Sequence, residues 1–395
     1  SPKEILNNLY TYIITPDLLV TDYFVVGSTG GAFVNSSLVM AISLLLLWFS
    51  GTTLTGNILS RSMLMAGFAL FGKNFLNILP FFLGVFIYCR IRKIPMKDYT
   101  AAALYSCALA PIVSAVVSSQ QLPHILRLPL GIVVGALISY ILIPIAEHSF
   151  GAHMGYTLFN YGFAGGLLAI VVASIVRGIS HTPIKTASIW QNGIDISALI
   201  FLTLLCSCFI SWGFFNSGCS LKPLCSIMSR SGRAPDDFVL SNGLGPTVLN
   251  MGLVGLICLM YILIIGGDLN GPITGAILTC MGFAASGLHP KNIFPTILGV
   301  FIATFAIAQP ATAPSLQMAA LFGTTLAPIA GQFGTVYGLV AGFLHAFLVL
   351  TIAEPCGGYN LYNNGFSAGL ISIIMVAFIQ GFSKKWHRNL EIEQQ

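Results

Sequence analysis

Two carboxylates stand at positions where a membrane protein rarely has them. Glu147 and Glu354 each follow a long apolar stretch and precede a glycine-rich one, in the segments IPIAEH and LTIAEP. A carboxylate at membrane depth costs several kcal/mol unless it faces protein, water or a partner, so each is a candidate for binding a solute or an ion. The alternative is that each satisfies the end of a helix. The matching contexts of the pair favour the functional interpretation.

A polar aromatic block follows each carboxylate. The two blocks are GYTLFNYGFAGGL from Gly155 and GYNLYNNGFSAGL from Gly358, identical at eight of thirteen positions. Irregular backbone at membrane depth is tolerated only inside protein or beside a water-filled cavity. We therefore expect a cavity for a small, flat, polar solute, with aromatic walls and amide groups from Tyr156, Phe159, Asn160, Tyr359, Tyr362 and Asn363. The alternative is that the rings form ordinary helix contacts and the asparagines join helices.

Two proline motifs and a histidine are further candidates. Pro111 and Pro328 stand in matching LAPI motifs. They are predicted to break helices near mid-membrane and free carbonyl groups toward a pore, although ordinary membrane helices also tolerate proline. His345 is alone in an apolar helix, and we expect a packed, hydrogen-bonded side chain there rather than a proton relay.

The elements that carry these residues form two related halves. Matching blocks keep their order in both: LTGNI and LNGPI, NILPFFLGVFI and NIFPTILGVFI, ALYSCALAPIVS and ALFGTTLAPIAG. The apolar segments lie near 32–50, 56–71, 75–91, 99–118, 127–147 and 162–177, then 247–267, 271–288, 292–308, 314–332, 335–354 and 365–382, with one more near 195–216. The predicted organisation is an interfacial segment (1–30), repeat 1 (31–180), a linker with an extra helix (181–245), repeat 2 (246–383) and a tail (384–395).

Composition assigns the chain to a class. Of its 395 residues 56% are apolar and 7% are charged, whereas soluble domains carry about a quarter charged residues. We predict an all-α, multi-pass protein of the plasma (inner) membrane with 12 or 13 apolar segments, in contact with membrane lipid. The 17 basic residues lie in short loops and indicate topology rather than nucleic-acid binding. Nine cysteines without a CxxC pair make a metal or another cofactor unexpected.

Charge placement indicates how the halves are oriented. The loop after the third segment holds Arg90, Arg92, Lys93 and Lys97, whereas the equivalent loop QPATAPS holds no charge. If these loops lie on opposite sides, the repeats are inverted, and the extra segment supplies the required crossing. The 217–245 loop and the C-terminal tail are then cytoplasmic, although Arg177 and Lys185 would lie outside. Inverted repeats place solute sites at their interface near the midplane.

The order of the motifs resembles that of the urea transporter family. GGDLNGPITGAILTCMGF is similar to its segment with an NP core, TILGVFIATFAIA to its next helix, and AALFGTTLAPIAG and EPCGGYNLYNNGFSAGL to two later motifs. The core reads GN at Gly56–Asn57 and GP at Gly271–Pro272. The resemblance implies two inverted repeats around a narrow pore, a trimer, and passive conduction of urea-like solutes. It implies pore residues Phe159, Phe163, Tyr362 and Phe366 and a ladder at Thr324 and Thr325. Asn57 and Asn270, in the matching LTGNI and LNGPI blocks, are further candidates for the pore.

These observations favour a channel or facilitator for a small polar, urea- or amide-like solute. The alternative is a secondary transporter of a small organic solute in which Glu147 and Glu354 bind H⁺ or Na⁺. A membrane enzyme or an assembly subunit is a third hypothesis. No GxxxxGK[ST], GxSxG, HExxH or GxGxxG motif is present, so an enzyme is not predicted.

Overall fold

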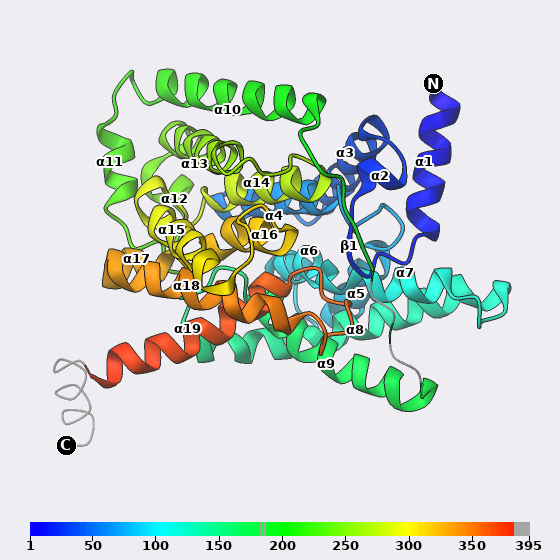
Figure 1. Ribbon diagram of the computed structural model, residues 1–395. Helices are drawn as coiled ribbons and strands as arrows, with labels where there is room; N and C mark the ends of the chain where they lie inside the picture. The colour runs from blue at the N-terminus through cyan, green and yellow to red at the C-terminus, as the bar shows by residue number, and fades with distance from the viewer. Residues whose placement is uncertain (182–183, 185–186, 383–395) are drawn as a thin grey trace.

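The structure is a computed structural model that describes residues 1–181, 184 and 187–382, and helices make up nearly all of it (Figure 1). The tail predicted at 384–395, and Lys185, lie outside the described residues. The helices up to residue 180 are α1 (Pro2–Ile14), α2 (Tyr23–Val26), α3 (Thr29–Phe49), α4 (Gly56–Phe68), α5 (Leu79–Arg92), α6 (Thr100–Ser106), α7 (Ala110–Ser118), α8 (His124–His153) and α9 (Asn160–Ser180), with 3₁₀ turns η1 (Met96–Tyr99) and η2 (Cys107–Leu109).

The rest of the chain follows a similar order. Its helices are α10 (Ile196–Asn216), α11 (Lys222–Met228), α12 (Phe238–Asn242), α13 (Leu244–Ile264), α14 (Gly271–Phe283), α15 (Pro290–Ile307), α16 (Pro314–Phe322), α17 (Ala327–Phe333), α18 (Thr335–Ile352) and α19 (Asn363–Gly381), with the 3₁₀ turn η3 (Gly323–Leu326). Two short strands, β1 (Leu19–Thr21) and β2 (Ala187–Ile189), pair in parallel. They tie the N-terminal segment to the linker between the halves.

Nine helical stretches in the described part of the chain are long and apolar enough to cross a membrane. They are Thr29–Phe49, Met96–Ser118, His124–His153, Asn160–Ser180, Ile196–Asn216, Leu244–Ile264, Pro290–Ile307, Thr335–Ile352 and Asn363–Gly381. The prediction of an all-α, multi-pass membrane protein is confirmed, whereas the segments predicted near 56–71, 75–91, 271–288 and 314–332 are not among these nine. Many of their residues are exposed and apolar, as lipid contact requires.

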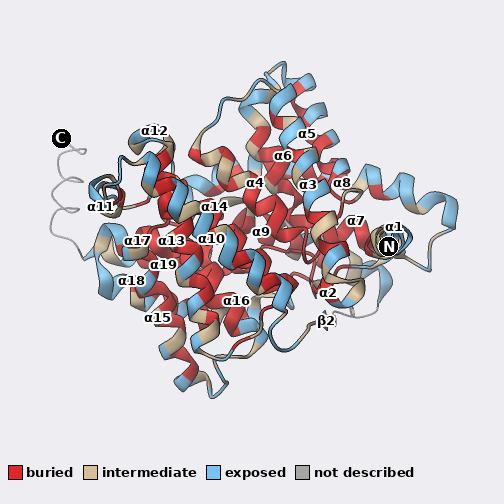
Figure 2. Ribbon diagram, turned by 90° about the horizontal axis from the view of Figure 1, so that it is seen from above, coloured by how far each residue is buried: buried red, intermediate tan, exposed pale blue. Residues whose placement is uncertain are grey.

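Helices α4 and α14 are shorter than the sequence predicted. The apolar segments near 56–71 and 271–288 each give a helix of only 13 residues. At 1.5 Å per residue, such a helix extends about 20 Å, less than the roughly 30 Å of the hydrocarbon core. Both helices are largely buried in the middle of the protein, where most of the ribbon is coloured as buried (Figure 2). They are central elements rather than lipid-facing spans.

Glycine lets α4 and α14 pack with their backbones in contact. A Cβ added at Gly67 would lie 2.3 Å from the carbonyl oxygen of Gly275, and one at Gly275 would lie 2.2 Å from that of Gly67. Only glycine allows this approach, which is the usual role of small residues between membrane helices. Each helix begins at a side-chain cap, because Thr55 accepts a hydrogen bond from the N–H of Ile58 and Asn270 accepts one from that of Ile273.

Two aspartates hold the starts of α4 and α14 in a reciprocal way. Asp22 Oδ1 accepts a hydrogen bond from the N–H of Gly271, and Asp237 Oδ1 accepts one from the N–H of Gly56. Burial raises the pKa of Asp22 to about 6, and the backbone N–H groups that it accepts from oppose this rise. Each aspartate therefore binds the first turn of a helix from the other half of the chain.

Two asparagines form matching clamps on the ends of the same helices. Asn35 Nδ2 donates to the carbonyl groups of Ala69 and Lys73 at 2.7 and 2.8 Å. Asn250 Nδ2 donates to those of Ala284 and Leu288 at 2.7 and 2.8 Å. Three pairs of residues correspond here, and the members of each pair are separated by the same number of residues: Asn35 and Asn250, Ala69 and Ala284, and Lys73 and Leu288. Equivalent positions in the two halves therefore make equivalent contacts.

The LAPI motifs coincide with interruptions of two helices. The turn η2 separates α6 from α7, with Pro111 at the second position of α7, and η3 separates α16 from α17, with Pro328 at the second position of α17. Proline has no N–H to donate to the preceding turn, so the α-helical hydrogen bonding stops there. These breaks bring Ala108 and Thr325 to the middle of the protein, where both are buried.

Candidate functional site

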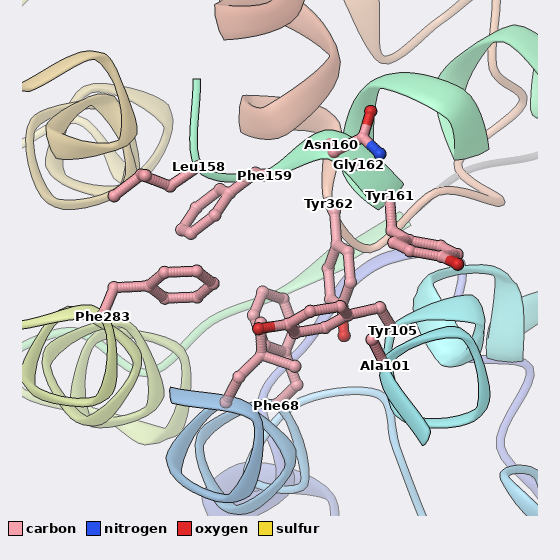
Figure 3. Close-up of a pocket in the computed structure, with 11 residues that line it drawn as sticks. Phe68, Ala101, Tyr105, Leu158, Phe159, Asn160, Tyr161, Gly162, Phe283 and Tyr362 are labelled. Atoms are coloured by element: carbon pink, nitrogen blue, oxygen red, sulfur yellow. The ribbon is translucent and has the colours of Figure 1, made fainter. Parts of the chain in front are cut away.

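An aromatic cavity of about 150 Å³ lies among elements of both halves (Figure 3). Its lining consists of Leu64, Phe68, Ala101, Tyr105, Leu158, Phe159, Asn160, Tyr161, Gly162, Phe283 and Tyr362. The rings of Phe159 and Phe283 face each other on one side of the view, opposite those of Tyr362 and Tyr105. No acidic side chain is among these lining residues.

The rings around the cavity form two matching groups of three. In one, Phe68 stacks on Phe322 with a centroid distance of 5.3 Å and meets the edge of Tyr362 at 4.4 Å. In the other, Phe283 stacks on Tyr105 at 6.3 Å and meets Phe159 at 4.7 Å. Each member of one group occupies the position in its half that its counterpart occupies in the other.

Two helices begin at the cavity. Phe159 and Tyr362 immediately precede α9 and α19, which leave the centre of the molecule toward opposite sides of Figure 1. The helices cross at Gly162 and Gly365, where a Cβ added to either residue would lie 3.0 Å from the Cα of the other. Glycine at this crossing lets the two aromatic residues approach the same space.

Glycine also accommodates the next pair of rings. A Cβ at Gly166 would lie 2.1 Å from the ring of Phe366, and one at Gly369 would lie 2.4 Å from the ring of Phe163. The rings of Phe163 and Phe366 are themselves 6.0 Å apart. These two predicted pore residues fill the helix crossing and do not line the cavity.

Asn160 lines the cavity, but its amide is already used. Figure 3 shows this side chain pointing away from the aromatic rings. Its Nδ2 donates to the carbonyl of Ala146 at 2.8 Å, and its Oδ1 is 2.8 Å from His153 Nε2. Because His153 Nδ1 accepts from the N–H of Gly155, Nε2 carries the proton and donates to Asn160. The amide therefore fixes the start of α9 against the end of α8.

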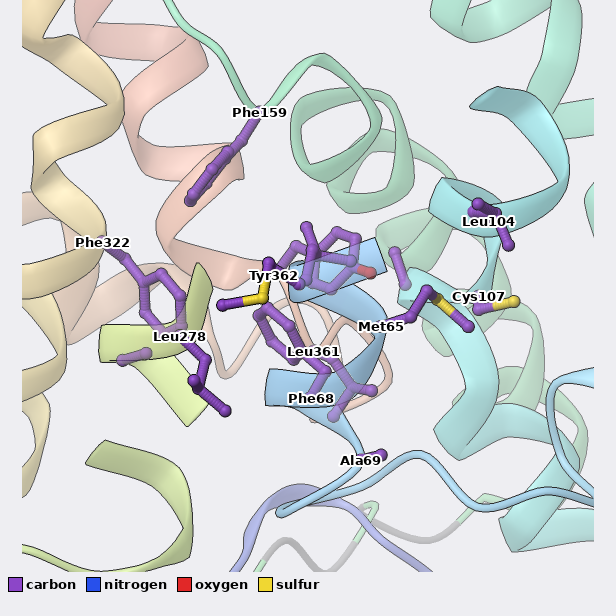
Figure 4. Close-up of a cluster of buried hydrophobic side chains, with 14 of the residues drawn as sticks. Met65, Phe68, Ala69, Leu104, Cys107, Phe159, Leu278, Phe322, Leu361 and Tyr362 are labelled. Atoms are coloured by element: carbon purple, nitrogen blue, oxygen red, sulfur yellow. The ribbon is translucent and has the colours of Figure 1, made fainter. Parts of the chain in front are cut away.

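Lys73 lies beside the cavity and is completely buried. Its Nζ donates to the hydroxyl of Tyr362 and lies 3.2 Å from the sulfur of Met65. It is also 5.3 Å from the ring centroid of Phe68 and 4.8 Å from that of Tyr362, two rings that line the cavity. Figure 4 shows the apolar cluster to which these neighbours belong (Figure 4). The clamp from Asn35 on the Lys73 carbonyl fixes the backbone at this position.

The cavity has its more exposed edge at Ala101, Tyr105 and Tyr161, which are half-buried. Arg61 lies one turn before Leu64 on α4 and donates from Nη1 to Thr100 Oγ1 at 3.2 Å. Because residues three and four apart share a helix face, Arg61 lies on the side of α4 that lines the cavity. Its Nε is buried, with no hydrogen-bond partner in the described part of the chain.

The structure does not bring Glu147 and Glu354 to the cavity. Both side chains are exposed, and neither is among the lining residues. Glu147 accepts a hydrogen bond from the hydroxyl of Tyr99 at 3.1 Å, and the backbone carbonyl of Glu354 accepts one from Arg177. The sequence analysis predicts the site between these two carboxylates, but the cavity lies elsewhere.

Among the predicted pore residues, Phe159, Asn160 and Tyr362 line the cavity, and the others have different surroundings. Tyr156 is buried, stacks on Phe333 at 5.1 Å and faces the guanidinium of Arg233. Thr325 Oγ1 accepts from the N–H groups of Leu158 and Phe159, which holds the segment entering α9.

The remaining predicted residues make structural contacts away from the lining. Tyr359 and Asn363 are buried, and Thr324 donates to the carbonyl of Leu321. Asn57 donates to Asp237, and Asn270 caps α14 and donates to the carbonyl of Gln191. Pro111 and Pro328 begin helices and are not in the lining either.

Sequence reasoning missed several of the residues around the cavity. Phe68, Tyr105 and Phe283 stand in apolar helices, where an aromatic residue reads as ordinary packing. The sequence analysis places all 17 basic residues in short loops that indicate topology, but Arg61 lies within α4, and Lys73, in the turn between α4 and α5, is completely buried. Its single charge inside the apolar run FGKNF was the available signal.

The helices and the buried centre define a multi-pass membrane protein. The chain belongs to the family described as a protein of unknown function (DUF1576), which matches residues 1–178 and 216–381. The two matched stretches include most of both halves, and the unmatched stretch between them includes nearly all of α10. No curated protein and no solved structure matches the chain significantly.

Proposed function

We propose that this protein is a channel or facilitator that passes a small polar solute through the aromatic cavity between two inverted repeats. The observation that carries the proposal is the cavity itself. Two matching pairs of rings line it, Phe68 with Phe283 and Phe159 with Tyr362, at the place where α9 and α19 begin. Solute sites in inverted-repeat transport proteins form where such interrupted helices meet.

The inverted arrangement is supported by reciprocal contacts. Gly67 approaches Gly275, while a Cβ at Gly282 would lie 3.0 Å from the carbonyl oxygen of Ser60. The earlier residue of α4 thus meets the later residue of α14 and the reverse, so the two helices run antiparallel. Asp22 and Asp237 exchange partners in the same way. Antiparallel packing of equivalent elements is what a two-fold axis in the membrane plane produces.

The lining indicates the shape of the solute. A cavity of about 150 Å³ is the size that holds a benzene-sized molecule. Aromatic faces stack well on flat groups, and Tyr105 and Tyr161 add hydroxyl groups at the exposed edge. Small amides and carboxylates have both properties. Ion coupling through Glu147 and Glu354 gains no support, because both are exposed outside the lining.

The test is solute flux through the purified, full-length protein in liposomes. Ala101→Trp places an indole in the cavity, whereas Ala377→Trp places one on the exposed face of α19 as a control. We expect flux of a small amide or carboxylate in the wild type and the control, and loss of most of it in Ala101→Trp. Equal flux in Ala101→Trp and wild type, or no flux of any such solute, would contradict the proposal.

A further inference from the structure

The charge beside the cavity has no counter-charge. No carboxylate among the described residues lies within ion-pair distance of Lys73 Nζ, whose contacts are a phenol, a thioether and two aromatic faces. Burying an ammonium without an anionic partner costs several kcal/mol unless the group loses its proton, and an anion that enters the cavity would favour the charged form. Tyr362 connects this ammonium to the cavity, because its ring lines the cavity and its hydroxyl accepts from Lys73.

Arg61 is a second basic residue close to the lining. Its Nε is buried and has no acceptor among the described residues, whereas Nη1 donates to Thr100 and the guanidinium also interacts with Tyr105. An unsatisfied buried donor is uncommon and calls for a partner. Arg61 precedes Leu64 and Phe68 on the cavity-facing side of α4. A solute at the exposed edge of the cavity would therefore lie near the Arg61 guanidinium.

The start of α9 adds a third positive feature. Asn160, Tyr161 and Gly162 line the cavity, and no side chain caps this helix. The first N–H groups of a helix of this length carry a partial positive charge that favours anions. All three features have the same sign, and no acidic residue is among the lining residues, although the exposed carboxylate of Glu147 acts electrostatically on Tyr161 at the cavity edge.

From these features we infer that the cavity binds a small, flat monoanion, with Lys73 as its main counter-charge and Arg61 at its entrance. The inference rests on the proposed transport function and specifies its solute class. Flatness follows from the paired rings, and small size from the volume. A single negative charge balances the ammonium of Lys73. An organic carboxylate and an inorganic anion such as nitrate share this chemistry.

The experiment measures binding to the purified, full-length protein by calorimetry. The probes are pyruvate, nitrate and pyruvamide, which is a neutral molecule of nearly the same size and shape as pyruvate. We expect pyruvate, nitrate or both to bind more tightly than pyruvamide. Binding of only one of the two anions identifies the solute as organic or inorganic. Pyruvamide binding that equals the tighter anion would overturn the inference.

Lys73→Met tests the assigned counter-charge, with the exposed Lys97→Met as the matched control. We expect about tenfold or greater loss of anion affinity in Lys73→Met, because the positive charge beside the cavity is removed. Pyruvamide affinity should not change, and Lys97→Met should bind as the wild type does. Unchanged anion affinity in Lys73→Met would overturn the inference.

Two further measurements separate binding from folding. Replacing an unpaired buried charge by an apolar residue often stabilises a protein, so Lys73→Met should melt no lower than the wild type. If that variant does not fold, Arg61→Met and the charge-preserving Lys73→Arg give the same contrast, with anion affinity lowered in the first and retained in the second. Flux of neutral amides without binding of either anion would overturn this inference and leave the transport function standing. Absence of both would remove the two together.

Discussion

The two sides of the aromatic cavity share a scaffold and differ in chemistry. Where the first half has Tyr105 and Tyr161, the corresponding residues of the second half are Phe322 and Asn364. The two cations differ more sharply, because Arg61 corresponds to Ala276 and Lys73 to Leu288. The aromatic rings and the crossing glycines are kept on both sides. Packing has therefore stayed symmetric while the polar groups that could bind a solute are gathered on one side.

The polar residues on the second side satisfy one another. His345 is completely buried, and its two ring nitrogens lie 3.1 Å from Asn364 Oδ1 and 3.1 Å from Ser367 Oγ. Gly135 packs on Pro80 as Gly338 packs on Pro295, and in this register Leu142 is the residue of the first side that corresponds to His345. This histidine therefore has the packed, hydrogen-bonded surroundings that the sequence suggested. The contrast is between a buried histidine whose two ring nitrogens both have partners and Lys73, whose side-chain nitrogen has no anionic partner among the described residues.

The shared scaffold should break most severely at the contact between α4 and α14. Gly275→Ala puts a methyl group where the Gly67 carbonyl lies, so the helices must separate, at a cost of about 1–3 kcal/mol or more. We expect a large loss of monodisperse protein and a lower melting temperature in detergent. Gly67→Ala should act alike if the halves are equivalent. Gly178→Ala on α9, with nothing within 4 Å, is the control; normal melting of Gly275→Ala would refute the contact.

The reciprocal aspartates test the equivalence of the halves with a smaller effect. Asp22→Ala and Asp237→Ala each leave backbone N–H groups at a helix start without an acceptor, and we expect a loss of about 1.5–3 kcal/mol in either case. Thermal melting of the two purified variants makes the comparison. Similar losses are expected, and full tolerance of one substitution would show that the two contacts are not equivalent.

Moving a hydroxyl group from Tyr105 to the corresponding Phe322 tests whether the first side of the cavity is the more exposed one. Phe322 is buried, so Phe322→Tyr places a hydroxyl among apolar groups and should cost about 1–3 kcal/mol unless it finds a partner. Tyr105 is half-buried at the exposed edge, so Tyr105→Phe should cost less than about 1 kcal/mol. Melting temperatures measured in parallel decide the point, and the opposite order of losses would contradict the assignment of the exposed edge.

The smallest effect is a pH dependence at Asp22. Its folded pKa of about 6 lies above the ordinary value of 3.8, so the folded protein binds this proton more tightly than the unfolded chain does. The free energy of unfolding should therefore fall as pH rises from about 4 to 6 and change no further from this group above that range. Melting of wild type and Asp22→Asn across this range isolates the effect. A constant difference between the two proteins would contradict it.

The helices could be predicted from the sequence because apolar length is a local property. The segments near 162–177 and 195–216 lie within α9 and α10. The cavity was only partly predictable: Phe159 and Tyr362 stand in polar blocks that cannot face lipid, whereas Phe68 and Phe283 stand in apolar helices. The exposure of Glu147 and Glu354 depends on how helix ends pack against distant segments, which spacing along the chain does not encode.

The exchange of partners between Asp22 and Asp237 also has a consequence for how the protein is made. Asp22 leaves the ribosome long before Gly271, the residue that its carboxylate must bind. Helix α4 is too short to span the bilayer and has its closest packing partner in α14, which is synthesised much later. Until then, α4 has only its contacts within the early half, such as the clamp from Asn35. Completion of the fold is a late event that follows insertion of the second half.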